Sequence, residues 1–303
     1  MSKQPSFSSL HTSFDPDQFI RHALKEDTSP PSLKPSNGRR VSSGDHTSLS
    51  TIPSGAKNKA ALFIKENGVL AGVELAKKIF ATVDRSLKVN ILKQDGSLVR
   101  KGDIAFTVSG NARSILTAER LVLNCMQRMS GIATLTNRFV SLCKPYKTKV
   151  LDTRKTTPGI RALEKWAVRI GGGYNHRFGL YDMILIKNNH IDFSGGIKQA
   201  IGSANTYLKR KGLKLKIEIE ARNLKEVQEI LSIGKIDRIL LDNFPVPGIK
   251  KAVKLINRKY ETEISGGVNE KNIRKYASCG ADYISVGALT HSVKSLDMSL
   301  TAR

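Results

Sequence analysis

The sequence is poor in cysteine, in aromatic side chains and in long apolar runs. Its three cysteines, Cys125, Cys143 and Cys279, are far apart and form no CxxC pair, which argues against a disulfide framework or a zinc site and favours reduced thiols. No apolar run approaches the roughly 20 residues of a membrane-spanning helix, and no apolar segment follows a basic start as in a secretory signal. We therefore expect a cytoplasmic protein without a membrane partner.

Acidic residues are also scarce. The chain has 50 Lys+Arg against 26 Asp+Glu, a formal net charge of +24, which would suit nucleic acid, an anionic surface or an acidic substrate. The basic residues are spread through every segment, however, without zinc-finger spacing, an aromatic RNA-binding motif or a dense basic tail. Because charge alone specifies no mechanism, nucleic-acid binding is a weaker alternative than a site for an acidic small molecule.

The first part of the chain predicts a small α+β domain. Residues 1–14 are expected to be a flexible N-terminus, and the polar, proline-rich residues 28–43 a mobile loop. Asp15 is a candidate N-cap of an amphipathic helix. The domain should cover 15–117, with a helix over 15–25, strands over 60–72, 88–98 and 103–109, and a helix over 73–83.

Residues 114–142 predict a long helix that is apolar on several sides, which is typical of a buried helix or a subunit contact. Arg120, Asn124 and Arg128 follow one another at a spacing of four and so share one face. This face is either a solvated polar stripe or a surface that donates Arg120 across a subunit interface.

The remainder alternates short β-branched runs with helical stretches, the pattern of a parallel sheet covered by helices. We assign 118–288 to an α/β barrel domain and 289–303 to a segment that packs back on the first domain. The expected strands are 149–152, 183–187, 215–220, 238–242, 261–265 and 283–287. Helices between them are expected, for example, over 224–233, 247–257 and 270–279.

Nearly every predicted strand ends in a chemically useful residue. These residues are Asp152, Lys187, Glu220, Asp242, Ser265 and Gly287. Groups repeated at the carboxyl ends of successive strands are the layout of a TIM-type barrel site, whereas a doubly wound sheet binds its ligand at one switch point. The glycine turns at 265–267 and 286–288 expose backbone N–H groups that can hold a phosphate, although glycines also serve turns alone.

The residues around these strand ends indicate the ligand. Glu220 and Asp242 are hard oxygen donors that suit Mg²⁺ shared with substrate phosphates, or a general acid and base. A strongly basic stretch at 151–191 can grip planar carboxylates. Together they predict an acidic ligand reacting with a phosphorylated sugar.

Several motifs carry a specific resemblance. These are GDHTS (44–48), NGVLAG (67–72), AERLVLNCMQRMSGIAT (118–134), LDTRKTTPG (151–159), GGGYNHRFGLYDMILIKNNHI (171–191), IEIEA, LLDNF, ISGGV and YISVGALTHS. In order and over nearly the whole chain from Asp15, they resemble the quinolinate phosphoribosyltransferase family.

The resemblance implies transfer of phosphoribose from phosphoribosyl pyrophosphate to quinolinate, with decarboxylation, in NAD synthesis. It implies a fold with an N-terminal α/β sandwich domain and an open, incomplete TIM-like barrel, in a homodimer or hexamer whose active site is shared. By motif, the substrate-binding residues would be Thr153, Arg154, His176, Arg177 and Lys187, with Arg120 from the partner subunit and Ser265, Gly266 and Gly287 around the 5′-phosphate. Lys155, Glu220 and Asp242 would serve the pyrophosphate, the last two as ligands of Mg²⁺.

Two features depart from the family pattern. The family usually has an acidic residue after the lysine of its KDNH motif, whereas this chain has Asn188 after Lys187. The missing charge is expected to alter the orientation or the pKa of Lys187 and so to reduce activity. The 28–43 loop is also longer than usual, but it should leave the barrel untouched.

Overall fold

The computed structural model describes residues 14–30 and 42–303, which fold into two compact units. The first unit holds the described residues up to Thr134 together with Lys294–Arg303, and the second is Leu135–Val293. The expected flexible N-terminus and mobile loop fall mostly on 1–13 and 31–41, outside the described residues.

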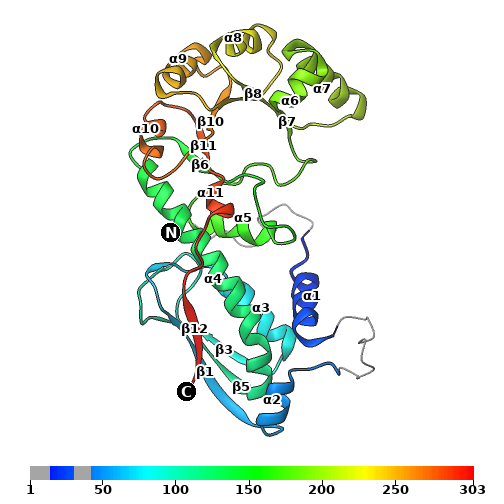
Figure 1. Ribbon diagram of the computed structural model, residues 1–303, viewed down its shortest axis with the longest axis vertical. Coiled ribbons are helices and arrows are strands. Elements are labelled where there is room, and N and C mark those ends of the chain that lie inside the picture. Colours follow the sequence, from blue (N-terminus) through cyan, green and yellow to red (C-terminus); the bar gives the residue numbers. More distant parts are fainter. Residues whose placement is uncertain (1–13, 31–41) are drawn as a thin grey trace, which may run out of the picture. The chain divides into compact units, whose positions relative to one another are not determined.

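The first unit is built on a four-stranded antiparallel sheet with the order β12-β1-β5-β3. Phe80 of α3 packs edge-on against Phe106 of β5, with ring centroids 5.8 Å apart. Its strands are β1 (Lys57–Ile64), β3 (Lys88–Ile91), β5 (Ile104–Asn111) and β12 (Met298–Ala302), beside a two-stranded sheet of β2 (Gly68–Val69) and β4 (Leu98–Val99); its helices are α1 (Pro16–Thr28), α2 (His46–Thr51) and α3 (Val73–Val83) (Figure 1).

Two strands expected in this unit are each broken. The run 60–72 divides into β1 and β2, and the run 88–98 ends early as β3 before the short β4. The break between β3 and β4 contains Asp95, whose buried carboxylate accepts the backbone N–H of Val73 at 2.9 Å. Asp95 thus caps α3, whose own N-cap is Gly72 and has no side chain to do so.

The second unit contains a six-stranded parallel sheet with the order β6-β11-β10-β9-β8-β7. Since β6 pairs with β11 but not with β7, the ring of strands is open on that side, as expected for an incomplete TIM-like barrel. The strands are β6 (Lys149–Leu151), β7 (Ile184–Ile186), β8 (Ile217–Ala221), β9 (Arg238–Asp242), β10 (Glu261–Ser265) and β11 (Tyr283–Ser285) (Figure 1).

Helices alternate with these strands, as the sequence predicts. Expected and observed bounds agree closely for α8, whereas α10 is shorter than expected because Asn269 and Asn272 form a hydrogen-bonded turn before it. The helices are α5 (Arg161–Ile170), α6 (Asn188–Ser194), α7 (Ile197–Lys211), α8 (Leu224–Ile233), α9 (Val246–Ile256), α10 (Ile273–Ala277) and α11 (Ala288–His291).

The units divide inside helix α4 (Ala112–Cys143), at Thr134/Leu135, and not at the expected 117/118. The reason is that one unbroken helix contributes its first part to one unit and its last part to the other. The C-terminal segment forms β12, which lies in the first unit and pairs antiparallel with β1 from Ala60↔Ala302 to Ile64↔Met298.

Candidate active site

A pocket of about 810 Å³ lies at the carboxyl ends of the parallel strands of the second unit. This volume is in the range of small-molecule sites. Its lining contains all but one of the site residues named from the sequence: Thr153, Arg154, Lys155, His176, Arg177, Lys187, Glu220, Asp242, Ser265, Gly266 and Gly287. Residues that are spread over more than 130 positions of the sequence therefore line one cavity.

Strand geometry explains this convergence. Side chains alternate between the two faces of a strand, so a residue two positions before a strand end lies below it on the same face. Leu240 thus lies below Asp242, Glu263 below Ser265 and Ser285 below Gly287, and all six line the pocket. The sheet supplies an upper layer of functional groups and a lower layer that forms the floor.

The two acids of the upper layer are already oriented by hydrogen bonds. Lys187 Nζ donates to Glu220 Oε1 at 2.9 Å, and the backbone N–H of Asn188 donates to Glu220 Oε2 at 3.0 Å. Asn188 Nδ2 also approaches Asp242 Oδ2 at 3.5 Å. Asn188 therefore donates to both carboxylates, to Glu220 from its backbone and to Asp242 from its side-chain amide. An ionised aspartate at this position could make only the backbone contact.

Two arginines supply cationic groups to the pocket. Arg154 Nε is buried and has no hydrogen-bond partner among the described residues. Arg177 donates from Nη1 to the carbonyl of Met183 at 3.1 Å. Burial lowers the pKa of Arg177, and the nearby Arg154 lowers it further. Two guanidinium groups that repel each other favour a ligand with more than one negative charge.

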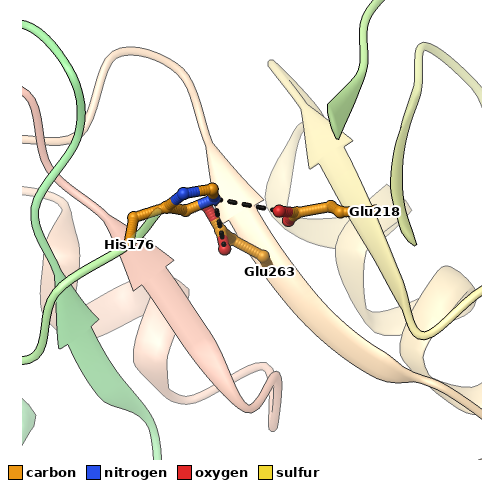
Figure 2. Close-up of side chains that lie close together, drawn as sticks. All are labelled: His176, Glu218 and Glu263. Carbon is orange, nitrogen blue, oxygen red and sulfur yellow. Dashed lines mark hydrogen bonds and ion pairs between the residues drawn. The ribbon is translucent and has the colours of Figure 1, made fainter. Parts of the chain in front are cut away.

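The side chain of His176 lies against two buried glutamates, Glu218 of β8 and Glu263 of β10 (Figure 2). Its Nδ1 accepts the backbone N–H of Arg177 at 2.7 Å, so Nε2 carries the proton and donates to Glu218 Oε2 at 2.9 Å. Glu263 Oε2 lies 3.6 Å from the same nitrogen. Both ring nitrogens thus have protein partners, and a direct bond from Nε2 to a ligand requires the ring to release Glu218.

The buried glutamates hold protons at unusually high pH. Burial raises the pKa of Glu218 and of Glu263 to about 7, and Glu218 adds to the shift of Glu263 by repulsion. Burial lowers the pKa of His176. The charged groups facing this cluster are Arg238, Arg177, Lys165, Asp152 and Glu220.

The same three residues offer ligand atoms within 4.8 Å of one another, as a metal site would. However, Arg238 Nη1 already lies 2.8 Å from Glu263 Oε2. A divalent cation would add charge beside this guanidinium, Arg177 and Lys165. A single proton instead leaves one negative charge on the two glutamates, which Arg238 balances. We therefore interpret the cluster as a proton-holding floor and not as a metal centre.

The glycine turns form the other end of the pocket. Gly266 has φ +99°, and a Cβ there would meet Asn243 Oδ1 at 2.1 Å. A Cβ on Gly287 would lie 3.0 Å from Lys155 Cδ, so the lysine passes directly over this glycine. Exposed backbone and close approach are what an anion cradle requires.

Arg120 is the one predicted site residue that the pocket lining does not include. It is exposed on α4 in the first unit. Its predicted role in a neighbouring subunit's site stays a prediction.

Sequence reasoning missed the lower layer and its supports. Glu218, Glu263 and Lys165 were assigned no role, although an acid in the middle of a predicted strand, as in IEIE and ETEIS, is itself a signal. Such a residue must face either solvent or a buried partner. The period of two would have placed both glutamates below strand-end residues already chosen.

A second hollow of about 850 Å³ lies at the amino ends of the same strands. Its lining mixes Lys147, Lys149 and Arg258 with Glu261 and Asp282. Because the amino-terminal face of such barrels serves stability and the charges there are mixed, the slightly smaller pocket at the carboxyl ends is the better candidate.

Comparisons with known proteins point to a single family. The family described as quinolinate phosphoribosyl transferase matches with its N-terminal domain at 45–130 and its C-terminal domain at 132–301. The chain is 46% identical to the chloroplastic nicotinate-nucleotide pyrophosphorylase [carboxylating] of Arabidopsis thaliana, over 96% of this chain and 83% of that protein. It is 44% identical, with the same coverage, to a mitochondrial quinolinate phosphoribosyltransferase [decarboxylating] of Nicotiana tabacum.

Solved structures show the same architecture. The nicotinate-nucleotide pyrophosphorylase of Francisella tularensis superposes with a TM-score of 0.85 at 37% identity, covering 95% of this chain and 96% of that one. The described residues contain no helix long and apolar enough to span a membrane.

Proposed function

The chain belongs to the quinolinate phosphoribosyltransferase family, and from that premise we propose how its pocket carries out the family's reaction. The enzyme transfers phosphoribose from phosphoribosyl pyrophosphate to quinolinate with loss of CO2. The products are nicotinate mononucleotide and pyrophosphate, and the reaction belongs to NAD biosynthesis.

Quinolinate binds, in our proposal, on the cationic side of the pocket. Arg154 and Arg177 bind its carboxylates, with Lys187 and Thr153 beside them. The unpartnered, buried Nε of Arg154 is a donor that a substrate carboxylate can satisfy. His176 contributes either a direct bond, after releasing Glu218, or the orientation of Arg177 through its backbone N–H.

Phosphoribosyl pyrophosphate occupies the opposite side. Its 5′-phosphate lies against Ser265, Gly266 and Gly287, whose turns offer backbone N–H groups. Lys155, which crosses Gly287, is placed to neutralise the pyrophosphate.

Glu220 and Asp242 suit Mg²⁺ because they offer hard carboxylate oxygens at the pocket surface. When bound there with the substrate, Mg²⁺ would supply positive charge to the departing pyrophosphate. The two acids themselves stabilise positive charge on the ribose as the leaving group departs.

The order of events follows from charge and position. The pocket fixes the pyridine nitrogen in line with the anomeric carbon, which removes much of the entropic barrier to transfer. Transfer leaves the ring nitrogen positively charged, and this charge stabilises the electron pair left at the neighbouring carbon when its carboxylate departs as CO2. No covalent nucleophile is required.

One observation carries the proposal: a dicarboxylate-sized set of cations and a glycine-lined anion cradle lie in the same 810 Å³ pocket as two acids. The test is release of CO2 and pyrophosphate from quinolinate plus phosphoribosyl pyrophosphate. Arg154→Ala should lower kcat/KM by about 100-fold or more, as expected when a charged contact to a bound carboxylate is lost. Turnover with nicotinate but not quinolinate would overturn the substrate assignment and leave the reaction class intact.

We also propose a homodimer in which Arg120 of the partner subunit completes the quinolinate side. Exposure of Arg120 on the surface of its own unit supports this proposal. The proposed compartment is the cytoplasm, because the three cysteines are free and buried; imaging of a fluorescent fusion would check it against the plastid and mitochondrial locations of the plant relatives.

A further inference from the structure

A buried ion pair lies beneath the cationic side of the pocket. Lys165 of α5 and Asp152 at the end of β6 are 2.5 Å apart, with side-chain exposures of 1% and 0%. Neither residue lines the pocket. A fully buried lysine is rare and costly unless it is paired, so its position requires an explanation.

The pair binds both sides of His176. Asp152 Oδ1 accepts the backbone N–H of His176 at 2.8 Å, and Lys165 Nζ donates to the carbonyl of His176 at 3.0 Å. Asn175 Nδ2 donates to Asp152 Oδ2 at 2.6 Å and to the carbonyl of Lys165 at 2.9 Å. Burial raises the pKa of Asp152, but every hydrogen-bond partner of its carboxylate is a donor, which favours the ionised form.

The pair occupies the side on which the barrel is open. The chain at 174–177 belongs to no strand, and its only sheet-like contact is the bridge between Leu151 and Tyr174. Elsewhere in the sheet, neighbouring strands fix one another through backbone hydrogen bonds. Here backbone bonds are made only by Tyr174, whose N–H donates to the carbonyl of Val150 at 2.8 Å and whose carbonyl accepts the N–H of Asp152 at 3.0 Å. Beyond Tyr174 the side chains of Asp152 and Lys165 hold the backbone of His176.

The position of the pair in the chain determines what it controls. Asp152 immediately precedes the segment of Thr153, Arg154 and Lys155, and His176 immediately precedes Arg177. Arg154 follows Asp152 closely in the chain and Arg177 follows His176. A shift of the ion pair would therefore change the separation between Arg154 and Arg177.

We propose that Lys165 and Asp152 are positioning residues that fix the separation of the two arginine-bearing segments and thereby determine affinity for the dicarboxylate substrate. This inference rests on the proposed function, since it assigns the ligand of those segments. The 5′-phosphate end is anchored separately, by the turns after β10 and β11.

Three variants test the proposal, with dissociation constants for quinolinate and phosphoribosyl pyrophosphate measured separately by calorimetry. Lys165→Met and Asp152→Asn each leave one buried partner unpaired and should unfold more easily. The double variant Lys165→Met/Asp152→Asn removes both charges, so its thermal stability should largely recover. Its quinolinate affinity should still be about ten-fold or more below that of the wild type, with a much smaller change for phosphoribosyl pyrophosphate.

Recovery of stability without recovery of quinolinate affinity is the result that a purely structural role would not give. Ile230→Ala in α8 is the matched control, because it removes buried apolar volume in the same unit away from the pocket. It should lower stability without changing the ratio of the two affinities.

Asn175→Ala removes only one hydrogen-bonding partner of the pair and is expected to fold. It therefore tests the inference even if the variants of Lys165 and Asp152 do not fold. It should weaken quinolinate binding about three-fold or more. The inference would be overturned if the double variant or Asn175→Ala bound quinolinate with wild-type affinity. Equal losses of affinity for both substrates would also overturn it. Failure of the wild type to use quinolinate would instead overturn the proposed function.

Discussion

The glutamates under His176 should make the stability of the protein depend on pH. Their pKa values are raised to about 7 from 4.5, so the folded state holds protons that the unfolded chain releases. A raised carboxyl pKa contributes stability that is complete below pH 4.5 and is lost as the pH rises through about 7. At about 1.4 kcal/mol per pKa unit, the loss should be roughly 3 kcal/mol for each glutamate by pH 8.

Glu263→Gln should therefore flatten the decline of Tm between pH 5 and pH 8, because the amide keeps its protons throughout. Thermal melts of the two proteins across this range would measure the effect. Glu261→Gln on the same strand is the control: burial raises the pKa of Glu261, but Arg238 and Tyr283 more than offset that, so its pKa is lowered. Parallel Tm curves for wild type and Glu263→Gln would contradict the prediction.

Single residues were also where sequence reasoning was weakest. Some roles can be inferred from the residue type alone, as for arginine at 154 or aspartate at 242. The pairing of Lys165 with Asp152 depends on where α5 packs, which no local pattern reveals. Asn188 donates from its amide to Asp242 and from its backbone to Glu220, contacts that the sequence does not reveal, and its expected effect on activity stays a prediction.

At the scale of elements, the loop after β10 offers a test of the anion cradle. Gly266→Ala would place a Cβ 2.1 Å from Asn243 Oδ1 and 3.0 Å from Asn243 N, at φ +99°. The turn must shift, so affinity for phosphoribosyl pyrophosphate should fall about ten-fold while quinolinate affinity changes little. Calorimetry with each substrate would measure both.

Gly267→Ala provides a control for backbone strain alone. Gly267 also has a positive φ, +60°, but a Cβ there meets nothing within 4 Å. It should cost about 1 kcal/mol of stability with little effect on binding. Equal binding losses in the two variants would argue against a cradle at Gly266.

Element positions followed from periodicity wherever the pattern was local. Helices α3 and α8 lie at their expected residues, because each carries an apolar face bounded by clear ends. Strands failed where a distant residue decided the outcome, as when Asp95 interrupts a predicted strand to cap α3 from 22 positions away. The parallel arrangement of the strands followed from their alternation with helices, but the expectation of an open barrel came only from the family resemblance. The strand order, which places the opening between β6 and β7, came from the structure.

At the scale of the whole molecule, the shared site makes a prediction about mixed subunits. Arg120→Ala and Arg177→Ala should each be nearly inactive. If Arg120 acts in the partner's site, mixing the two variants should restore activity, because one of the two sites in a heterodimer is intact. Activity assays after mixing would measure the gain.

Subunit exchange must be verified, for example by mass spectrometry of tagged chains. Restoration approaching one quarter of wild-type activity is expected for random pairing of equal amounts. No restoration in verified heterodimers would show that Arg120 does not act across an interface. Nothing in the described structure explains the net charge of +24.

The pairing of β12 with β1 has a consequence for how the chain is made. The sheet of the first unit draws its edge strand from residues 298–302, on the far side of the entire second unit in the sequence. During synthesis on the ribosome, β1 must wait with one edge unpaired while the barrel emerges and folds. An unpaired strand edge is a template for association with other chains, so the interval before β12 arrives is when the nascent protein is most prone to aggregate.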